Sequence, residues 1–230
     1  MFYIGSCRYM CDFNWDSFPP RLHTTKEIIY FLQNIGNLKK IIDENPNELI
    51  NFIFGDIFHP MIKNKSISYI NTYNNYKNNK KVILEICSRK VYYYNDIPLS
   101  HYYTVTKGNK ILIDKYNLKE IILTDEEIEN DIIYIIQLCK KIFNENVEIH
   151  IIPHLNLKTK NLNNYIPDRN IFVNLLENLC QKHALKIHNI GKYIEKFDKN
   201  SYLEDYMSDS THYSKGFDKV IEFLNNEINK

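Results

Sequence analysis

The two ends of the chain carry the residue types of an activated nucleophile. Gly5-Ser6-Cys7 follows a short apolar stretch, and Asp209-Ser210-Thr211-His212 precedes the last segment with helical apolar spacing. A thiol beside an imidazole loses its proton more readily, and a carboxylate that holds the imidazole fixes its tautomer. Asp209 and His212 are three residues apart, so near-helical backbone places both side chains on one face. The pattern favours a catalytic site of Cys7, His212 and Asp209.

Each of these residues also has an ordinary structural interpretation. Cys7 can be a small buried hydrophobe, and Asp209 can cap the last helix with His212 exposed in its first turn. Ser6 is a rival nucleophile, because its hydroxyl can do the same chemistry beside a base. Cys7 and Cys11 can instead form a redox pair.

Alternating strands and helices must bring the two chain ends together. Short apolar runs predict five buried strands, at Phe2–Ile4, Leu49–Phe54, Lys81–Cys87, Val147–Ile152 and Leu185–Ile190. Capping boxes and apolar stripes predict helices over 24–36, 62–76, 124–139, 169–184 and 213–228. A segment rich in Tyr and Val around Asn95-Asp96 predicts a hairpin-like insertion at about 90–110. The chain is therefore expected to be a single α/β domain over 1–230, with a parallel sheet covered on both faces.

Residues suited to binding or catalysis follow the predicted strand ends, where ligands gather in such sheets. The residues expected in one site for this reason are Cys7, Gly55, Ser88 and His154. Two arginines, Arg8 and Arg89, also follow strand ends and can hold an anionic group or lie on the surface.

The other histidines and the tyrosine runs give weaker signals. His150 lies inside a predicted strand and fits a packing role, while His23 can face the site or cap the helix that follows it. His59 fits a loop, and no role is assigned to His183 or His188. The tyrosines at 92–94 and 102–103 can stack on sugar rings or pack in the core.

Composition excludes several classes of partner. Lys and Arg total 29 against 28 Asp and Glu, so no overall field attracts nucleic acid. No run approaches the roughly 20 apolar residues of a membrane span, and the N-terminal stretch lacks the features of a signal peptide. Five scattered cysteines favour a reducing compartment, so we expect a cytoplasmic protein without membrane attachment.

No glycine-rich phosphate loop is present and no group of carboxylates suggests a metal, so the sequence predicts no cofactor and no metal. The abundance of Ile, Asn and Lys suggests a low-GC genome such as that of a large DNA virus. The oligomeric state is not readable.

The order of these motifs resembles the SGNH/GDSL hydrolase superfamily. That family has Gly-Asp-Ser in its first block, a glycine in the second, an asparagine in the third and Asp-x-x-His in the last. Gly5-Ser6-Cys7 matches the first block with cysteine in place of the serine, Gly55 matches the second, and Asp209 and His212 match the last. The Gly-Ser-Cys start also resembles cysteine-bearing branches, including the GSCFA family and proteins of capsule polysaccharide biosynthesis. Cys87-Ser88-Arg89 departs from the third block.

The resemblance implies a three-layer α/β/α sandwich with a roughly five-stranded parallel sheet in flavodoxin-like order. It implies an acyl-ester hydrolase or an acetyl transferase that acts on a carbohydrate or similar small ester. Cys7 is then the nucleophile, and Ser88 can substitute for the missing asparagine as an oxyanion donor beside the Cys7 and Gly55 N–H groups. The alternative is a glycan-binding module on the same fold with degraded catalytic machinery.

Overall fold

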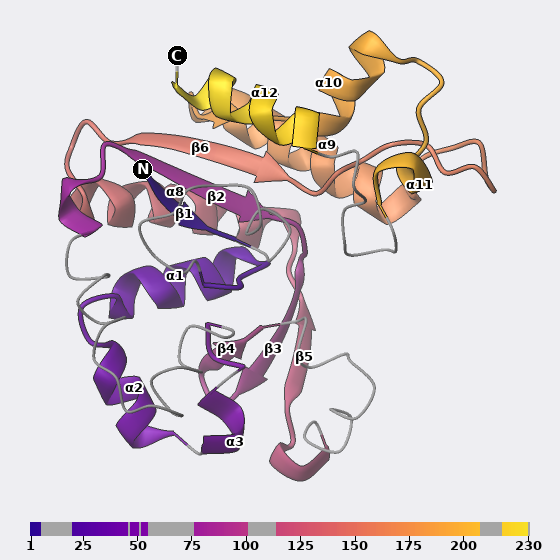
Figure 1. Cartoon of the computed structure of the whole chain (residues 1–230). Coiled ribbons are helices and arrows are strands. Elements are labelled where there is room, and N and C mark those ends of the chain that lie inside the picture. The colour runs from indigo at the N-terminus through magenta and orange to yellow at the C-terminus, as the bar shows by residue number, and fades with distance from the viewer. Residues whose placement is uncertain are drawn as a thin grey trace. The chain divides into compact units, whose positions relative to one another are not determined.

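The computed structural model describes residues 1–5, 20–45, 47–50, 52–54, 76–100, 114–207 and 218–229. The chain divides into two compact units, one holding the described residues up to 149 and the other those from 150 onward. The boundary lies inside strand β6, Glu148–Pro153 (Figure 1). The single domain expected from the sequence stays a prediction, and the two units are described in turn.

The first unit contains a buried pair of parallel strands. β1 (Phe2–Ile4) pairs with β2 (Lys81–Ile86), with Phe2 opposite Val82 and Ile4 opposite Leu84. All of β1 and the last five residues of β2 are buried, as expected for parallel strands that are covered on both faces. Helices α1 (Thr25–Asn34) and α8 (Asp125–Ile142) pack against each other in the same unit.

Capping residues begin both helices, as the sequence predicts. The Thr24 side chain accepts a hydrogen bond from the Glu27 N–H at the start of α1. Thr124 and Glu127 form a full capping box at the start of α8, each side chain satisfying a free N–H at the helix start.

Four phenylalanine rings pack together between the strand pair and these helices. The rings of Phe2 and Phe143 are 5.3 Å apart between centroids, and those of Phe31 and Phe54 are 5.0 Å apart. Phe2 also stacks with Phe31 at 6.4 Å. All four side chains are at most 6% exposed, so this cluster forms the centre of the first unit's core.

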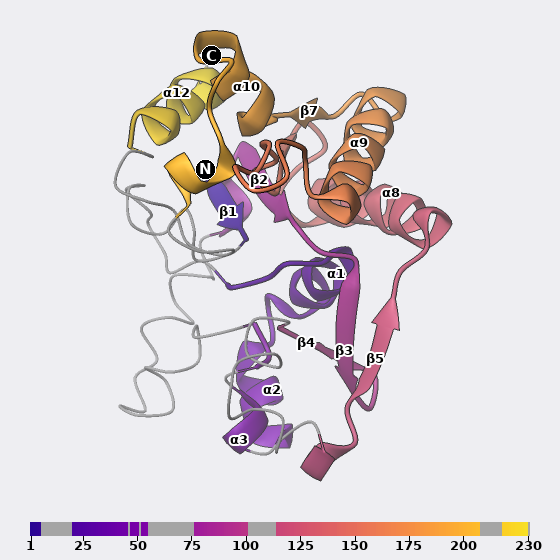
Figure 2. The same ribbon diagram turned by 90° about the vertical axis from the view of Figure 1, so that its right-hand side faces the viewer.

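A small antiparallel sheet completes the first unit (Figure 2). Its order is β4 (Ile97–Leu99), β3 (Lys90–Tyr94), β5 (Lys119–Ile122). The hairpin predicted around Asn95-Asp96 is confirmed as the β3–β4 connection, and Asn95 adopts a positive φ of 52° that asparagine tolerates in tight turns. The sequence did not predict β5.

The strand predicted at Leu49–Phe54 is wrong. Helix α3 covers Asn47–Ile50, and turn bonds follow it from the Phe52 N–H to the Leu49 carbonyl and from the Ile53 N–H to the Ile50 carbonyl. The described side chains of this run are nevertheless buried. A short apolar run predicts burial but does not separate a strand from a helical turn.

Two further short elements belong to the first unit: α2 (Leu38–Glu44) and the 3-10 turn η3 (Tyr76–Asn78). The helix predicted over 62–76 lies outside the described residues except for its last position, which begins η3.

The second unit has a parallel strand pair with helices. β6 pairs with β7 (Lys186–Ile187) in parallel, with His150 opposite Lys186, and α9 (Pro167–Lys182) connects the two strands. The remaining helices are α10 (Ile190–Phe197), α11 (Leu203–Tyr206) and α12 (Asp218–Asn229). The chain therefore has the predicted α/β class, a mixed fold of parallel strands and helices. No helix in the described part combines the length and apolar character that a bilayer span requires.

Candidate functional site

The carboxyl end of β1 is tightly built around Gly5. The Gly5 N–H donates to the Pro20 carbonyl at 3.3 Å, and the Gly5 carbonyl accepts from the Leu22 N–H at 3.1 Å. A Cβ at Gly5 would lie 2.5 Å from the Tyr3 hydroxyl oxygen and 2.6 Å from Glu85 Cβ, closer than real Cβ contacts allow. Only glycine fits this position, which immediately precedes the predicted nucleophile turn.

Tyr3 and Glu85 form a buried polar pair directly against Gly5. The Tyr3 hydroxyl donates to Glu85 Oε2 at 2.8 Å, and the two residues are 4% and 0% exposed. Sequence reasoning missed this pair. The available signal was Glu85, a single acidic residue inside the otherwise apolar run Val82–Ile86. Burying a carboxyl group costs free energy unless it is hydrogen-bonded, so a partner could have been expected.

The end of β2 is bonded to the loop that precedes α1. The His23 carbonyl accepts from the N–H groups of Cys87 and Ser88, each at 3.0 Å. The His23 N–H donates to Glu27 Oε2 at 2.8 Å, and both residues are buried. His23 was expected either to face the site or to cap the helix that follows it, and its backbone takes part in the start of α1. Through the bonds from Cys87 and Ser88 to His23, and from Leu22 to Gly5, this loop joins the carboxyl ends of β1 and β2.

Ser88 lies at the end of β2, where the prediction needs it, in the turn to β3. Its Oγ accepts from the Lys90 N–H at 3.0 Å and donates to the Lys90 carbonyl oxygen at 3.5 Å. Because the Ser88 N–H already donates to His23, Ser88 can reach an oxyanion only through its hydroxyl proton, which would first have to leave the Lys90 carbonyl. That role stays a prediction.

Arg89 pairs with a carboxylate in this structure. Its guanidinium contacts Asp125 in the first turn of α8, and its carbonyl accepts from the Leu123 N–H at 2.8 Å. An anionic ligand at Arg89 would compete with Asp125, so binding there carries the cost of breaking an ion pair.

His154 follows β6 in the second unit and is 9% exposed. Its Nδ1 lies 3.1 Å from the Leu155 carbonyl oxygen, which also accepts from Arg169 Nη1 at 3.0 Å. A carbonyl oxygen only accepts, so Nδ1 carries the proton in this contact and the neutral ring then has its lone pair on Nε2. His154 is thus a buried imidazole at a strand end, and its part in a pocket stays a prediction.

The remaining predicted site residues lie outside the described part of the chain. They are Ser6, Cys7, Arg8, Gly55, Asp209 and His212, together with Cys11 of the alternative redox pair. Gly5, two positions before Cys7, is the last described residue ahead of the proposed nucleophile.

A second polar pair, His150 and His188, lies within the second unit, and the sequence did not predict this contact. Nδ1 of His150 lies 2.9 Å from Nε2 of His188, and the rings are nearly parallel, with centroids 5.2 Å apart. His150 is fully buried, which agrees with the packing role predicted for it. Burial lowers the pKa of His188, Glu227 opposes this effect, and Lys186 adds to it. A pair of this kind needs at least one neutral ring, because one nitrogen must accept.

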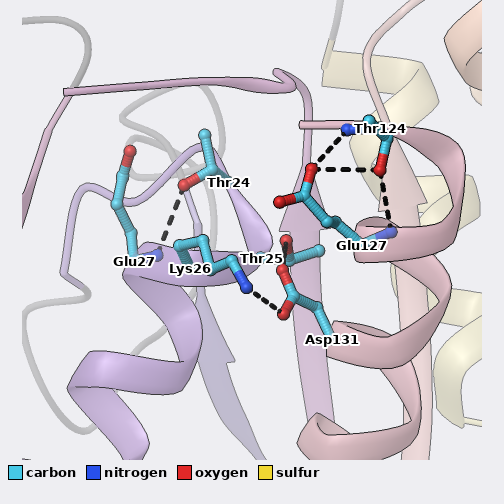
Figure 3. A network of polar contacts seen from close by, with 7 residues as sticks. All are labelled: Thr24, Thr25, Lys26, Glu27, Thr124, Glu127 and Asp131. Carbon is cyan, nitrogen blue, oxygen red and sulfur yellow. Dashed lines mark hydrogen bonds and ion pairs between the residues drawn. The ribbon is translucent and has the colours of Figure 1, made fainter. Parts of the chain in front are cut away.

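The N-terminal ends of α1 and α8 form a polar network (Figure 3). Asp131 accepts from Thr25 Oγ1 at 2.6 Å and from Lys26 Nζ at 2.7 Å. Burial, followed by the nearby carboxylates of this network, raises the pKa of Tyr93 to about 12. The two bonds to Asp131 join α1 to α8, so this part of the network serves the packing of the two helices.

The described residues contain no group of three His, Cys, Asp or Glu side chains suited to a metal ion. Cys139 and Cys180 are reduced thiols in this structure, and burial raises the pKa of each to about 12. These two cysteines are therefore poor nucleophiles at neutral pH.

No protein-family profile matches the chain, and no curated protein matches its sequence. Solved structures that resemble it include two mutants of Axe2 from Geobacillus stearothermophilus. A catalytic mutant of this acetylxylan esterase has 9% sequence identity and a TM-score of 0.45, covering 99% of this chain and 92% of the esterase chain. A second mutant, described as an acetyl-xylooligosaccharide esterase, has 10% identity and a TM-score of 0.45, covering 100% and 93%. Similarity at this level assigns neither an activity nor catalytic residues to the chain.

Proposed function

We propose that the chain is an acyl-ester hydrolase or acyl transferase of the SGNH type, acting on an acetylated carbohydrate or a similar small ester. Its nucleophile is Cys7, its general base is His212, and Asp209 orients His212. The observation that carries the proposal is the position of Gly5, which directly follows a buried parallel strand and precedes Ser6-Cys7 in the sequence. Nucleophiles of α/β enzymes occupy such strand ends.

The reaction follows from the chemistry of the three side chains. His212 removes the Cys7 proton, and the thiolate attacks the acyl carbon to form a tetrahedral oxyanion. When this collapses, the bond to the leaving alkoxide breaks, and His212 gives its proton to that oxygen. The resulting thioester is resolved by water in a hydrolase or by a sugar hydroxyl in a transferase, with His212 again acting as base.

The oxyanion needs donors aimed at it, and loss of one donor commonly costs about 3–4 kcal/mol of transition-state stabilisation. The donors proposed from the sequence are the N–H groups of Cys7 and Gly55 and the hydroxyl of Ser88. Because the Ser88 N–H is already bonded to His23, we expect Ser88→Ala to remove its entire contribution to catalysis.

The direct test exploits the sequence around the nucleophile. Trypsin cleaves after Arg8, so residues 1–8 form a peptide in which Cys7 is the single cysteine. After incubation with an activated acetyl ester, the proposal expects one acetyl group on this peptide, and fragmentation places it on Cys7. Acetyl on Ser6 instead would make the rival residue the nucleophile. An unmodified peptide together with full esterase activity in Cys7→Ala would exclude both.

A glycan-binding module is the second candidate, and the engagement of Ser88 and Arg89 with Lys90 and Asp125 favours it. Such a module binds glycan without turning over any ester. Glycan binding that survives His212→Ala, with no acylation of the wild-type protein, would support this candidate over the enzyme.

A further inference from the structure

The buried polar pair of Tyr3 and Glu85 packs directly against Gly5, so it can hold this residue and the predicted turn that follows it. Gly5 directly follows β1 and lies two positions after Tyr3, and the Tyr3 hydroxyl and Glu85, from the neighbouring strand, both lie beside its Cα. The 2.8 Å hydrogen bond from Tyr3 to Glu85 thus joins β1 to β2 at their carboxyl ends.

Backbone hydrogen bonds to the loop before α1 also hold Gly5. Gly5 bonds through its N–H to Pro20 and through its carbonyl to Leu22, in a parallel bridge with Arg21. The space beside its Cα is filled by the Tyr3 hydroxyl and the Glu85 side chain. Little room is left for Gly5 to move, so these contacts hold Gly5 in place.

We propose that Tyr3 and Glu85 are positioning residues for the nucleophile, and that their hydrogen bond holds Gly5, two residues before Cys7, in the place that catalysis needs. This inference rests on the proposed function, since it assumes that Cys7 reacts. A nucleophile misplaced by about 1 Å can lose a factor of about 100 in rate, so a bond made by Tyr3, four residues before Cys7, has a measurable effect. Neither residue touches the substrate in this account.

The principal variant is Tyr3→Phe, which keeps the ring in its buried place and removes the hydroxyl. Its matched control is Tyr165→Phe, because the Tyr165 hydroxyl also donates to a carboxylate, that of Glu195, within the second unit. We expect Tyr3→Phe to slow acylation of Cys7 about tenfold or more with KM unchanged, while Tyr165→Phe leaves the rate within about twofold of wild type.

The acceptor side gives an independent check. Glu85→Gln retains an oxygen that accepts from Tyr3, so its acylation rate should stay near wild type. Glu85→Leu removes the acceptor and should share the defect of Tyr3→Phe. Circular dichroism confirms that each variant is folded before rates are compared.

A pH profile separates positioning from a general loss of structure. Alkylation of Cys7 by iodoacetamide, followed on the peptide of residues 1–8, reports its thiolate fraction without needing an ester site. In Tyr3→Phe we expect the midpoint of this profile to rise toward about 8.5, the pKa of an ordinary thiol, because the imidazole no longer faces the sulfur correctly.

The outcomes distinguish this inference from the proposed function. If wild-type Cys7 is acylated but Tyr3→Phe matches it in rate and pH profile, the positioning role is overturned and the enzyme proposal stands. If wild-type Cys7 is not acylated, the enzyme proposal fails, and an unchanged alkylation profile in Tyr3→Phe would overturn the positioning role as well. A tenfold defect in both Tyr3→Phe and Tyr165→Phe would also overturn it.

Discussion

Replacing Asp131 with alanine should destabilise the first unit by removing the polar link between α1 and α8. Asp131 is 4% exposed and accepts from Thr25 Oγ1 at 2.6 Å and Lys26 Nζ at 2.7 Å (Figure 3). Thr25 is 1% exposed, so its hydroxyl loses its acceptor in a buried place. The two partners therefore contribute unequally.

The magnitude follows from the exposure of each partner. A buried hydrogen bond to a charged group contributes about 1.5–3 kcal/mol. The Lys26 side chain is 31% exposed, so its ion pair contributes less than about 1 kcal/mol. Asp131→Ala should thus lower the free energy of unfolding by about 2–4 kcal/mol, which for a chain of this length corresponds to a fall in Tm of about 4–16 °C.

Urea unfolding followed by circular dichroism measures this change through the midpoint, with the slope expected to stay constant. Thr25→Val should cost more than Lys26→Met. A double-mutant cycle between Asp131→Ala and Thr25→Val should give a coupling free energy of about 1 kcal/mol or more. A loss below about 0.5 kcal/mol for Asp131→Ala, or a larger cost for Lys26→Met than for Thr25→Val, would refute the reasoning.

Two further predictions concern the second unit. Because burial lowers the pKa of His188, the folded state binds fewer protons than the unfolded state, so stability should be highest above about pH 6.5 and fall as the pH drops below it. His188→Asn should reduce this slope in urea midpoints measured from pH 7.5 to 5, and an equal slope in both proteins would show that burial does not lower the pKa of His188. Gly191→Ala should prevent folding or lower Tm sharply, because its Cβ would lie 2.1 Å from the Asn156 carbonyl oxygen, whereas Gly36→Ala has its nearest contact at 3.8 Å and should fold normally. Thermal unfolding compares the two glycine variants, and similar Tm values would contradict this prediction.

Helices with explicit start signals were predictable from the sequence, and short apolar runs were not. The Thr24 and Thr124 caps each bond locally three residues ahead, so spacing alone located both helix starts. The described side chains of Leu49–Phe54 are buried as predicted, but the backbone turns helically. An apolar composition predicts burial, whereas contacts with residues distant in the sequence decide the backbone conformation. β5 was not predicted because its side chains are largely exposed, so no apolar pattern marks it. Its pairing with β3 makes it a strand.

The candidate site was predictable only in part. Strand ends located Gly5 and Ser88, since a strand must end before a chain can turn. The pairing of Tyr3 with Glu85 was not readable, because the partners are 82 residues apart and meet only through the register of β1 and β2. The link between Arg89 and Asp125 has the same origin, a contact created by the fold between residues distant in the sequence.

The central claim is that Cys7 forms an acyl bond with substrate, and mass spectrometry of the tryptic peptide of residues 1–8 tests it most directly. After brief exposure to an activated acetyl ester, the account predicts an acetyl group on Cys7 that disappears on further incubation with water or a sugar acceptor. His212→Ala should slow its formation. An unmodified Cys7, in a folded protein that still hydrolyses the ester at the same rate as Cys7→Ala, would contradict the account.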